Sequence, residues 1–268
     1  MAYGSVFFPA RADTDSVTLA TTQSLTTVNT DAFTIEFWAM FANDNTSVSD
    51  TMFSAYDGDN TASLVFYIDS SGHDLSLAYG TSGSIGTGSG NRPSKHEWHH
   101  IAICKNGGNV QHFIDGVQVQ NTNVSAFNVP DTPFYLGRGR AGGGMHGYLA
   151  DVRVSNIARY DVNGYTLPTA PLSSDANTIW LFQVDITDTE ANNLTDKSSY
   201  AHTATLDGNA VLSGWNPFDK GTIPLTAINT IKTEHSVAVE KVLLCPADPL
   251  VDRAILEDVE EANDDFTL

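Results

Sequence analysis

Short runs of Val, Ile, Phe, Tyr and Thr recur along the chain and are separated by turn-forming residues. Between them lie segments rich in glycine, asparagine and aspartate, such as DGDN and NGGN. Short β-branched and aromatic runs bounded in this way are typical of strands. No helical periodicity of useful length precedes about residue 250. The pattern therefore predicts an all-β fold, an antiparallel β-sandwich or jelly roll, with strands at 33–41, 62–69, 75–79, 99–104, 110–115, 133–138, 147–155 and 178–184.

The best-defined local prediction is a pair of hairpins. A strand that starts at Trp98 should turn at Asn106-Gly107-Gly108 and return as residues 109–115. Asp115-Gly116 then forms a second tight turn that leads into residues 117–120. Such dipeptides accept the positive φ that tight hairpin turns require. Three consecutive strands joined this closely must be neighbours in one sheet.

The first of these strands begins within the stretch KHEWHHIAIC, which contains three histidines, a glutamate and a cysteine. Because strand side chains alternate, His96, Trp98 and His100 are expected on one face and Glu97 and His99 on the other. The stretch has neither an HExxH motif nor a Cys/His pair at ligand spacing. We therefore expect strand histidines with hydrogen-bonded rings rather than a zinc site.

The composition and charge of the chain exclude some classes of binding partner. The chain has 268 residues, and 13 basic against 32 acidic side chains give a formal net charge of −19. Phosphate backbones would be repelled, so nucleic acid is not expected as a partner. No apolar run reaches 18 residues, and the N-terminus lacks a basic segment followed by an apolar one. We therefore expect no membrane span and no signal peptide.

The amino-acid composition changes after Trp215. Residues 216–268 hold 4 basic and 11 acidic residues and four prolines. A short helix is predicted near residue 250, with Asp248 as its cap and Pro249 in its first turn. We therefore divide the chain into a body of residues 1–215 and an acidic C-terminal extension of residues 216–268. The extension either packs on the body or serves as an attachment arm for a partner.

Candidate chemistry is sparse. Glycoside hydrolysis needs paired carboxylates, yet Glu36 stands alone in its strand, and neither a Gly-x-Ser-x-Gly elbow nor a phosphate loop is present. We therefore expect no enzyme and no catalytic residue. Aromatic rings near strand ends can pack on sugars, and loop arginines can bind carboxylates. The candidate ligand-binding residues are Tyr79, Tyr135, Arg138, Arg140 and Tyr160.

No cofactor is expected, although calcium remains an alternative. The acidic loop Asp57-Gly58-Asp59-Asn60 resembles the start of a calcium loop, but the twelfth position holds no glutamate, so it is not an EF-hand. Asp57 and Asp59 are calcium candidates if other loops supply further ligands. Otherwise the loop is a solvated turn.

Several segments, taken in order, resemble a known family. They are FTIEFWAMF (33–41), EWHHIAICKNGGNVQHFIDGVQV (97–119), FYLGRG (134–139) and GYLADVRVSNIARY (147–160), followed by residues 167–184 and 194–214. Together they resemble the laminin-G-like (LamG) form of the concanavalin A-like lectin/glucanase jelly roll over about residues 5–215. The run at 154–182 also resembles laminin-G-like modules of tailed-bacteriophage structural proteins.

This resemblance implies a non-enzymatic virion structural protein of a tailed bacteriophage, either a capsid decoration protein or a tail or fibre component. It would be made in the host cytoplasm and join the virion, with other virion proteins and copies of itself as partners, forming a homo-oligomer. Its jelly roll would bind host-surface glycans weakly. The alternative is a free or surface-attached carbohydrate-binding or adhesion module, acting either with or without calcium.

Overall fold

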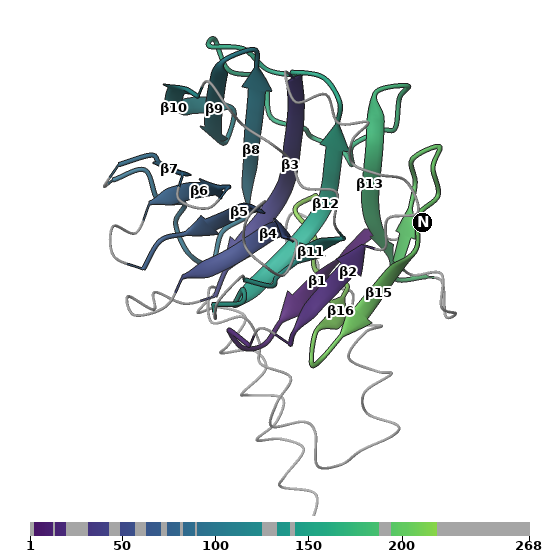
Figure 1. Ribbon diagram of the computed structural model, residues 1–268. Helices are drawn as coiled ribbons and strands as arrows, with labels where there is room; N and C mark the ends of the chain where they lie inside the picture. Colours follow the sequence, from purple (N-terminus) through teal and green to yellow (C-terminus); the bar gives the residue numbers. More distant parts are fainter. Residues whose placement is uncertain are drawn as a thin grey trace, which may run out of the picture. The chain divides into compact units, whose positions relative to one another are not determined.

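A computed structural model describes residues 3–12, 14–19, 32–42, 49–56, 63–70, 74–80, 83–88, 90–124, 133–139, 143–187 and 194–218. Within these residues the fold consists of strands and contains no helix, which confirms the predicted all-β class (Figure 1). None of the described residues belongs to a helix that could span a bilayer. The helix predicted near residue 250 lies outside the described residues, so the extension at 216–268 and its boundary stay predictions.

One antiparallel sheet, called sheet A, contains the longest strands. Its members are β1 (Tyr3–Phe8), β3 (Ala32–Phe41), β8 (His99–Asn106), β9 (Asn109–Ile114), β10 (Val117–Asn123), β12 (Gly147–Ser155), β13 (Thr178–Asp185), β14 (Leu194–Asp196) and β16 (Val211–Ser213). The strand order is β10-β9-β8-β3-β12-β1-β13-β14, and β16 also pairs with β1. Strands distant in sequence are therefore neighbours, as in a jelly roll.

The second sheet, called sheet B, packs against the first. It is built from β2 (Ser16–Leu19), β4 (Asp50–Tyr56), β5 (Ser63–Ile68), β6 (Leu75–Tyr79), β7 (Gly83–Gly86), β11 (Phe134–Leu136) and β15 (Ala204–Asp207). Their order is β15-β2-β11-β4-β5-β6-β7. All eight predicted runs contain a strand, whereas β1, β2, β4, β7 and β14–β16 were not predicted.

Both predicted hairpins are present. Asn106 pairs with Asn109 across the first turn, where Gly107 has φ = 56°. In the second turn, Asp115 and Gly116 both have positive φ, at 51° and 79°. This is the backbone conformation that Asp-Gly favours in a two-residue hairpin loop.

The structure corrects the start of the first strand. The strand begins at His99 rather than at Trp98, and His96 has φ = 63°, which is outside the β region. Lys95 instead forms an isolated parallel bridge with Phe41. The alternation of faces therefore does not extend back to His96, so His96 and His100 do not share a strand face. From His99 onward the alternation holds, and Ile101 and Ile103 belong to the core.

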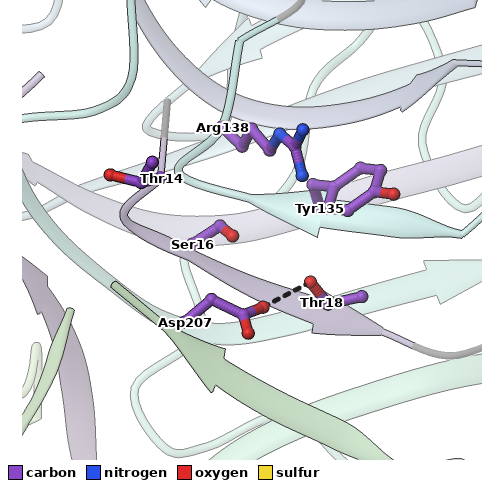
Figure 2. A pocket seen from close by; sticks show the side chains of 6 residues that line it. All are labelled: Thr14, Ser16, Thr18, Tyr135, Arg138 and Asp207. Carbon is purple, nitrogen blue, oxygen red and sulfur yellow. Dashed lines mark hydrogen bonds between the residues drawn. The ribbon is translucent and has the colours of Figure 1, made fainter. Parts of the chain in front are cut away.

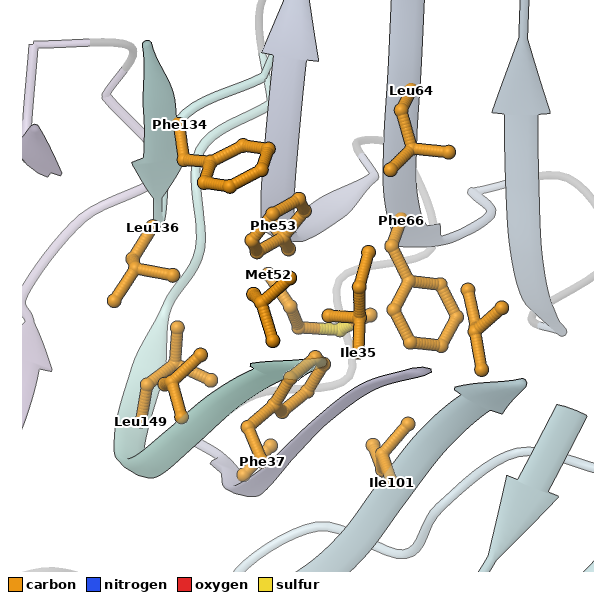
Figure 3. Packing of buried hydrophobic residues seen from close by; sticks show 14 of the residues in the cluster. Ile35, Phe37, Met52, Phe53, Leu64, Phe66, Ile101, Phe134, Leu136 and Leu149 are labelled. Carbon is orange, nitrogen blue, oxygen red and sulfur yellow. The ribbon is translucent and has the colours of Figure 1, made fainter. Parts of the chain in front are cut away.

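The core lies between the inner faces of the two sheets. Figure 3 shows Phe37 and Ile101 of sheet A approaching Phe53 and Phe66 of sheet B. All four side chains are fully buried, and the rings of Phe37 and Phe66 meet at 5.6 Å between centroids. Burying one such side chain contributes about 1.5–3 kcal/mol. The side chains of the hydrophobic runs thus form the core that holds the two sheets together.

Part of the outer face of sheet A is also covered. Residues 156–177, called the crossing segment, connect β12 to β13 and contact this face. The hydroxyl of Thr34 donates to the carbonyl oxygen of Ile157 at 2.8 Å and accepts from the N–H of Arg159 at 2.9 Å. All nine residues of the neighbouring strand β12 are buried, and at its other end Tyr148 packs against Trp98 and Trp215.

Candidate functional site

An open hollow of about 410 Å³ lies on the outer face of sheet B. Figure 2 shows its lining, and polar side chains predominate: Thr14, Ser16, Thr18, Tyr135, Arg138 and Asp207. Hydroxyl, guanidinium, carboxylate and aromatic groups therefore face one space. In ligand sites, converging polar groups of this kind fix the orientation of the ligand.

Strand register explains why these side chains meet. Thr18 of β2 lies opposite Tyr135 of β11 on one side and Thr205 of β15 on the other. Their strand neighbours Leu19 and Phe134 also pair, but those two residues point into the core. Because strand side chains alternate, the apolar partners fill the core while the polar ones face outward.

Two interactions arrange the walls of the hollow. The guanidinium carbon of Arg138 lies 4.7 Å from the centroid of the Tyr135 ring, within the range of a cation–π interaction. On the opposite wall, the hydroxyl of Thr18 donates to the carboxylate of Asp207 at 2.6 Å. Arg138 and Asp207 thus offer opposite charges to a ligand between them.

The backbone after β11 places Arg138 at the rim. Gly137 has φ = 79°, and a Cβ atom there would come within 2.2 Å of the Phe8 ring. Because glycine has no Cβ atom, it tolerates both the positive φ and the close approach of the Phe8 ring. The hydroxyl of Ser54 then donates to the carbonyl oxygen of Arg138 at 2.6 Å. These contacts fix the backbone of Arg138, so that its guanidinium can lie over the ring of Tyr135.

Two of the five predicted ligand residues, Tyr135 and Arg138, meet in the hollow. Tyr79 does not, because it pairs with Leu64 and its side chain packs against the core. Tyr160 belongs to the crossing segment on sheet A, whereas Arg140 lies outside the described residues. Sequence reasoning missed Thr14, Ser16, Thr18 and Asp207. For Ser16, Thr18 and Asp207 the sequence signal is a short alternation in SVTL and ATLD, which is too brief to predict strands, and Thr14 lies outside both.

Glycoside hydrolysis and metal binding would each require particular side chains in the described lining of the hollow. Among the described residues that line it, Asp207 is the one carboxylate, whereas a glycosidase needs two across the scissile bond. Within the described part of the chain, no three His, Cys, Asp or Glu side chains form a group that could hold a metal ion. The calcium candidates Asp57 and Asp59 lie outside the described residues.

A second group of polar side chains is buried under the crossing segment. Glu36 is completely buried, and its Oε1 accepts from Arg153 at 2.8 Å (Nε) and 2.7 Å (Nη2). Tyr160 donates to the other oxygen of Glu36, and the Tyr160 ring stacks on Tyr165 at 3.7 Å. Burial and the nearby Glu36 raise the pKa of Tyr160. Glu36, isolated in the sequence, is thus the centre of a closed structural cluster.

His100 adjoins this cluster as a neutral ring. Burial first, and then the charge of Arg153, lowers the pKa of His100 to about 3. Its Nδ1 lies 2.6 Å from the Tyr165 hydroxyl, and its Nε2 is 3.6 Å from Glu36. This geometry agrees with the predicted strand histidine whose ring is hydrogen-bonded.

Comparison with known proteins identifies the fold family. The sequence model described as the concanavalin A-like lectin/glucanases superfamily matches residues 11–161. A candidate carbohydrate-binding protein from Bacteroides ovatus has a similar structure, with a TM-score of 0.54 and 14% identity over 79% of this chain. The match covers 60% of the Bacteroides protein, so this chain spans less than two thirds of it.

Two further structures are similar. A heptameric SAP-like pentraxin from Limulus polyphemus gives a TM-score of 0.52 at 13% identity, over 79% of this chain and 94% of the pentraxin. Domains LG4-5 of the mouse laminin α1 chain give 0.46 at 13% identity, over 69% and 48%. At these identities the likeness concerns the fold. No curated protein matches the sequence.

Proposed function

The chain belongs to the concanavalin A-like lectin/glucanases superfamily, and we propose that its jelly roll binds carbohydrate, without cleaving it, in the hollow on sheet B. The observation that carries this proposal is the convergence of Arg138, Tyr135, Thr18 and Asp207 on one open space. Guanidinium and hydroxyl groups donate hydrogen bonds to sugar hydroxyls, and carboxylates accept them.

The shape of the hollow indicates weak binding at each site. It is open on one side, so a sugar placed there would keep much of its surface in water. Small-molecule sites that bind tightly enclose most of their ligand. Affinity therefore has to come from several copies acting together, which raises avidity without new contacts.

Multivalent display fits our second proposal, that the chain is a structural component of a tailed-bacteriophage virion. The resemblance of residues 154–182 to phage laminin-G-like modules supports this placement. The body would be exposed on the particle, as a capsid decoration protein or a tail or fibre component. The acidic residues 216–268 would attach it to a neighbouring virion protein.

A glycan array tests the binding proposal. The full-length chain is displayed in many copies on fluorescent beads and compared with the Arg138→Ala variant. We expect binding to a restricted set of glycans, with clear loss in the variant. Absence of binding by the intact chain, or equal binding by the variant, would reject the hollow as the site.

The same array separates the alternative function. Strong binding by the monomeric chain that disappears when a chelator removes calcium would favour a free or surface-attached, calcium-dependent adhesion module. Binding that requires multivalent display and withstands the chelator would favour the virion proposal. Mass spectrometry of purified particles then tests whether the chain is a virion component.

A further inference from the structure

Ser94, His99 and Asp115 form a hydrogen-bonded chain at the start of β8, on the sheet that does not carry the hollow. The Oγ of Ser94 lies 2.8 Å from Nε2 of His99, and Nδ1 of His99 lies 2.6 Å from Oδ2 of Asp115. A serine hydroxyl, an imidazole and a carboxylate are thus connected in the order that activates a serine in acyl transfer.

The hairpin fixes the carboxylate end of this chain. Asp115 occupies the second tight turn, and its Oδ1 accepts from the N–H of His100 at 2.9 Å. Burial alone would raise the pKa of Asp115, but the hydrogen bonds from His99 and His100 outweigh it and lower the pKa below its usual range. Asp115 is therefore a carboxylate at neutral pH and holds the Nδ1 proton of His99.

The serine and the histidine differ in their exposure to solvent, and the difference suits a reaction at the serine. His99 is 9% exposed, so its ring is shielded from bulk water, while Ser94 is exposed. In the neutral tautomer whose Nδ1 proton is held by Asp115, the lone pair of Nε2 faces the Ser94 oxygen and can accept its proton. An external electrophile can thus reach the oxygen while the base remains protected.

We propose that Ser94 is an activated nucleophile that attacks esters, with His99 as its general base and Asp115 as the group that orients His99. The Ser94 oxygen forms a bond to the ester carbonyl carbon as Nε2 takes the hydroxyl proton. The C–O bond to the alcohol then breaks, and the same proton passes to the departing alkoxide. Water attacks the acyl-serine by the reverse route and releases the carboxylic acid. This activity is independent of the glycan hollow.

Glu97 controls how much of the serine is activated. Its Oε2 accepts from the Ser94 hydroxyl at 2.7 Å, so Glu97 and His99 compete for one proton. While the hydroxyl donates to Glu97, no proton is available for His99 to remove. Removing the Glu97 carboxylate leaves His99 as the acceptor and should increase the reactivity of Ser94.

A fluorophosphonate probe tests the proposal on the full-length chain, because it phosphonylates activated serines. We expect mass spectrometry to locate the adduct on Ser94. Labelling should disappear in Ser94→Ala and slow by about 100-fold or more in His99→Gln, since a positioned base contributes about 10²–10⁴-fold. Ser199→Ala, a change at another exposed serine, is the matched control and should label normally.

Two further measurements separate reactivity from damage to the fold. Glu97→Ala should label several-fold faster than the natural chain, a gain that unfolding cannot produce. p-Nitrophenyl acetate should be hydrolysed by the natural chain and not by Ser94→Ala, with both showing the same thermal unfolding. Absence of an adduct on Ser94, unchanged labelling in His99→Gln, or no gain in Glu97→Ala would each overturn the proposal.

Discussion

Arg138 lies over the ring of Tyr135, with its guanidinium carbon 4.7 Å from the ring centroid. The two residues are only three positions apart, yet Gly137 turns the chain between them so that both side chains reach the same hollow. Because the guanidinium covers one face of the ring, a sugar in the hollow meets a charged donor before it meets the aromatic surface. Binding should therefore depend more on Arg138 than on stacking against Tyr135.

The first prediction maps glycan binding to the hollow. Thr18→Val removes the hydroxyl that orients Asp207, and we expect it to weaken binding about 10-fold, the loss of roughly one hydrogen bond to a charged group. Thr205→Ala alters an exposed threonine that does not line the hollow and should leave binding unchanged. Competition on glycan-coated beads measures both. Equal effects of the two variants would contradict the assignment.

The second prediction concerns the buried cluster. Glu36→Ala leaves the guanidinium of Arg153 without its carboxylate in a buried position. Breaking one partner of a buried pair typically costs about 3–5 kcal/mol. Denaturant unfolding should show a loss of this size, whereas Glu97→Ala, at an exposed glutamate, should change stability by less than about 0.5 kcal/mol. A small effect of Glu36→Ala would mean that water replaces the carboxylate.

The third prediction is a stabilising substitution. His112 pairs with Ile103, is fully buried, and within the described part of the chain neither of its ring nitrogens has a hydrogen-bond partner. An unsatisfied buried polar group costs about 1–3 kcal/mol. His112→Leu should therefore raise the free energy of unfolding by about 1–2 kcal/mol at pH 7. A loss of stability would show that the ring shape, rather than its polarity, matters at this position.

The fourth prediction is a loss of stability in acid. Burial lowers the pKa values of His100 and His112 from 6.5 to about 3, so the unfolded chain binds two more protons than the folded chain between these values. Asp151 acts in the opposite sense, because burial raises its pKa from 3.8 to about 6 and its stabilising contribution is lost as pH rises.

Near pH 5 these three groups leave a net excess of about one proton on the unfolded chain, so stability should fall by about 1.4 kcal/mol per pH unit on acidification. Denaturant unfolding at several pH values measures this slope. His112→Leu removes one of the two histidines and should reduce the slope by about 1.4 kcal/mol per pH unit. An unchanged slope in that variant would contradict the role of His112.

Local structure was largely predictable. Asn106-Gly107 and Asp115-Gly116 require positive φ that few other dipeptides accept, so the two hairpins follow from neighbouring residues alone. The family resemblance, carried by segments from β3 to β16, extended this to the sandwich fold. His96 shows the limit, since the backbone leaves the strand conformation at a residue whose side chain gives no warning.

The candidate site could be predicted only in part. Tyr135 and Tyr79 both lie near strand ends, and the sequence does not distinguish them. Register does, because Tyr135 lies opposite Thr18 on the outer face whereas Tyr79 lies opposite Leu64 on the core face. A shift of one residue in either strand would exchange these roles. Asp207 joins the site only because β15 pairs with β2 from the far end of the described chain.

By itself, the sequence determined the all-β class, the tight turns and the family, because these depend on local backbone preferences and on the order of short motifs. The tertiary structure decided which side chains meet. Glu36 finds Arg153, Thr18 finds Asp207, and His99 lies between Ser94 and Asp115. The first two contacts join strands distant in sequence and the third joins a loop to a hairpin turn, so their geometry is set by how the chain packs.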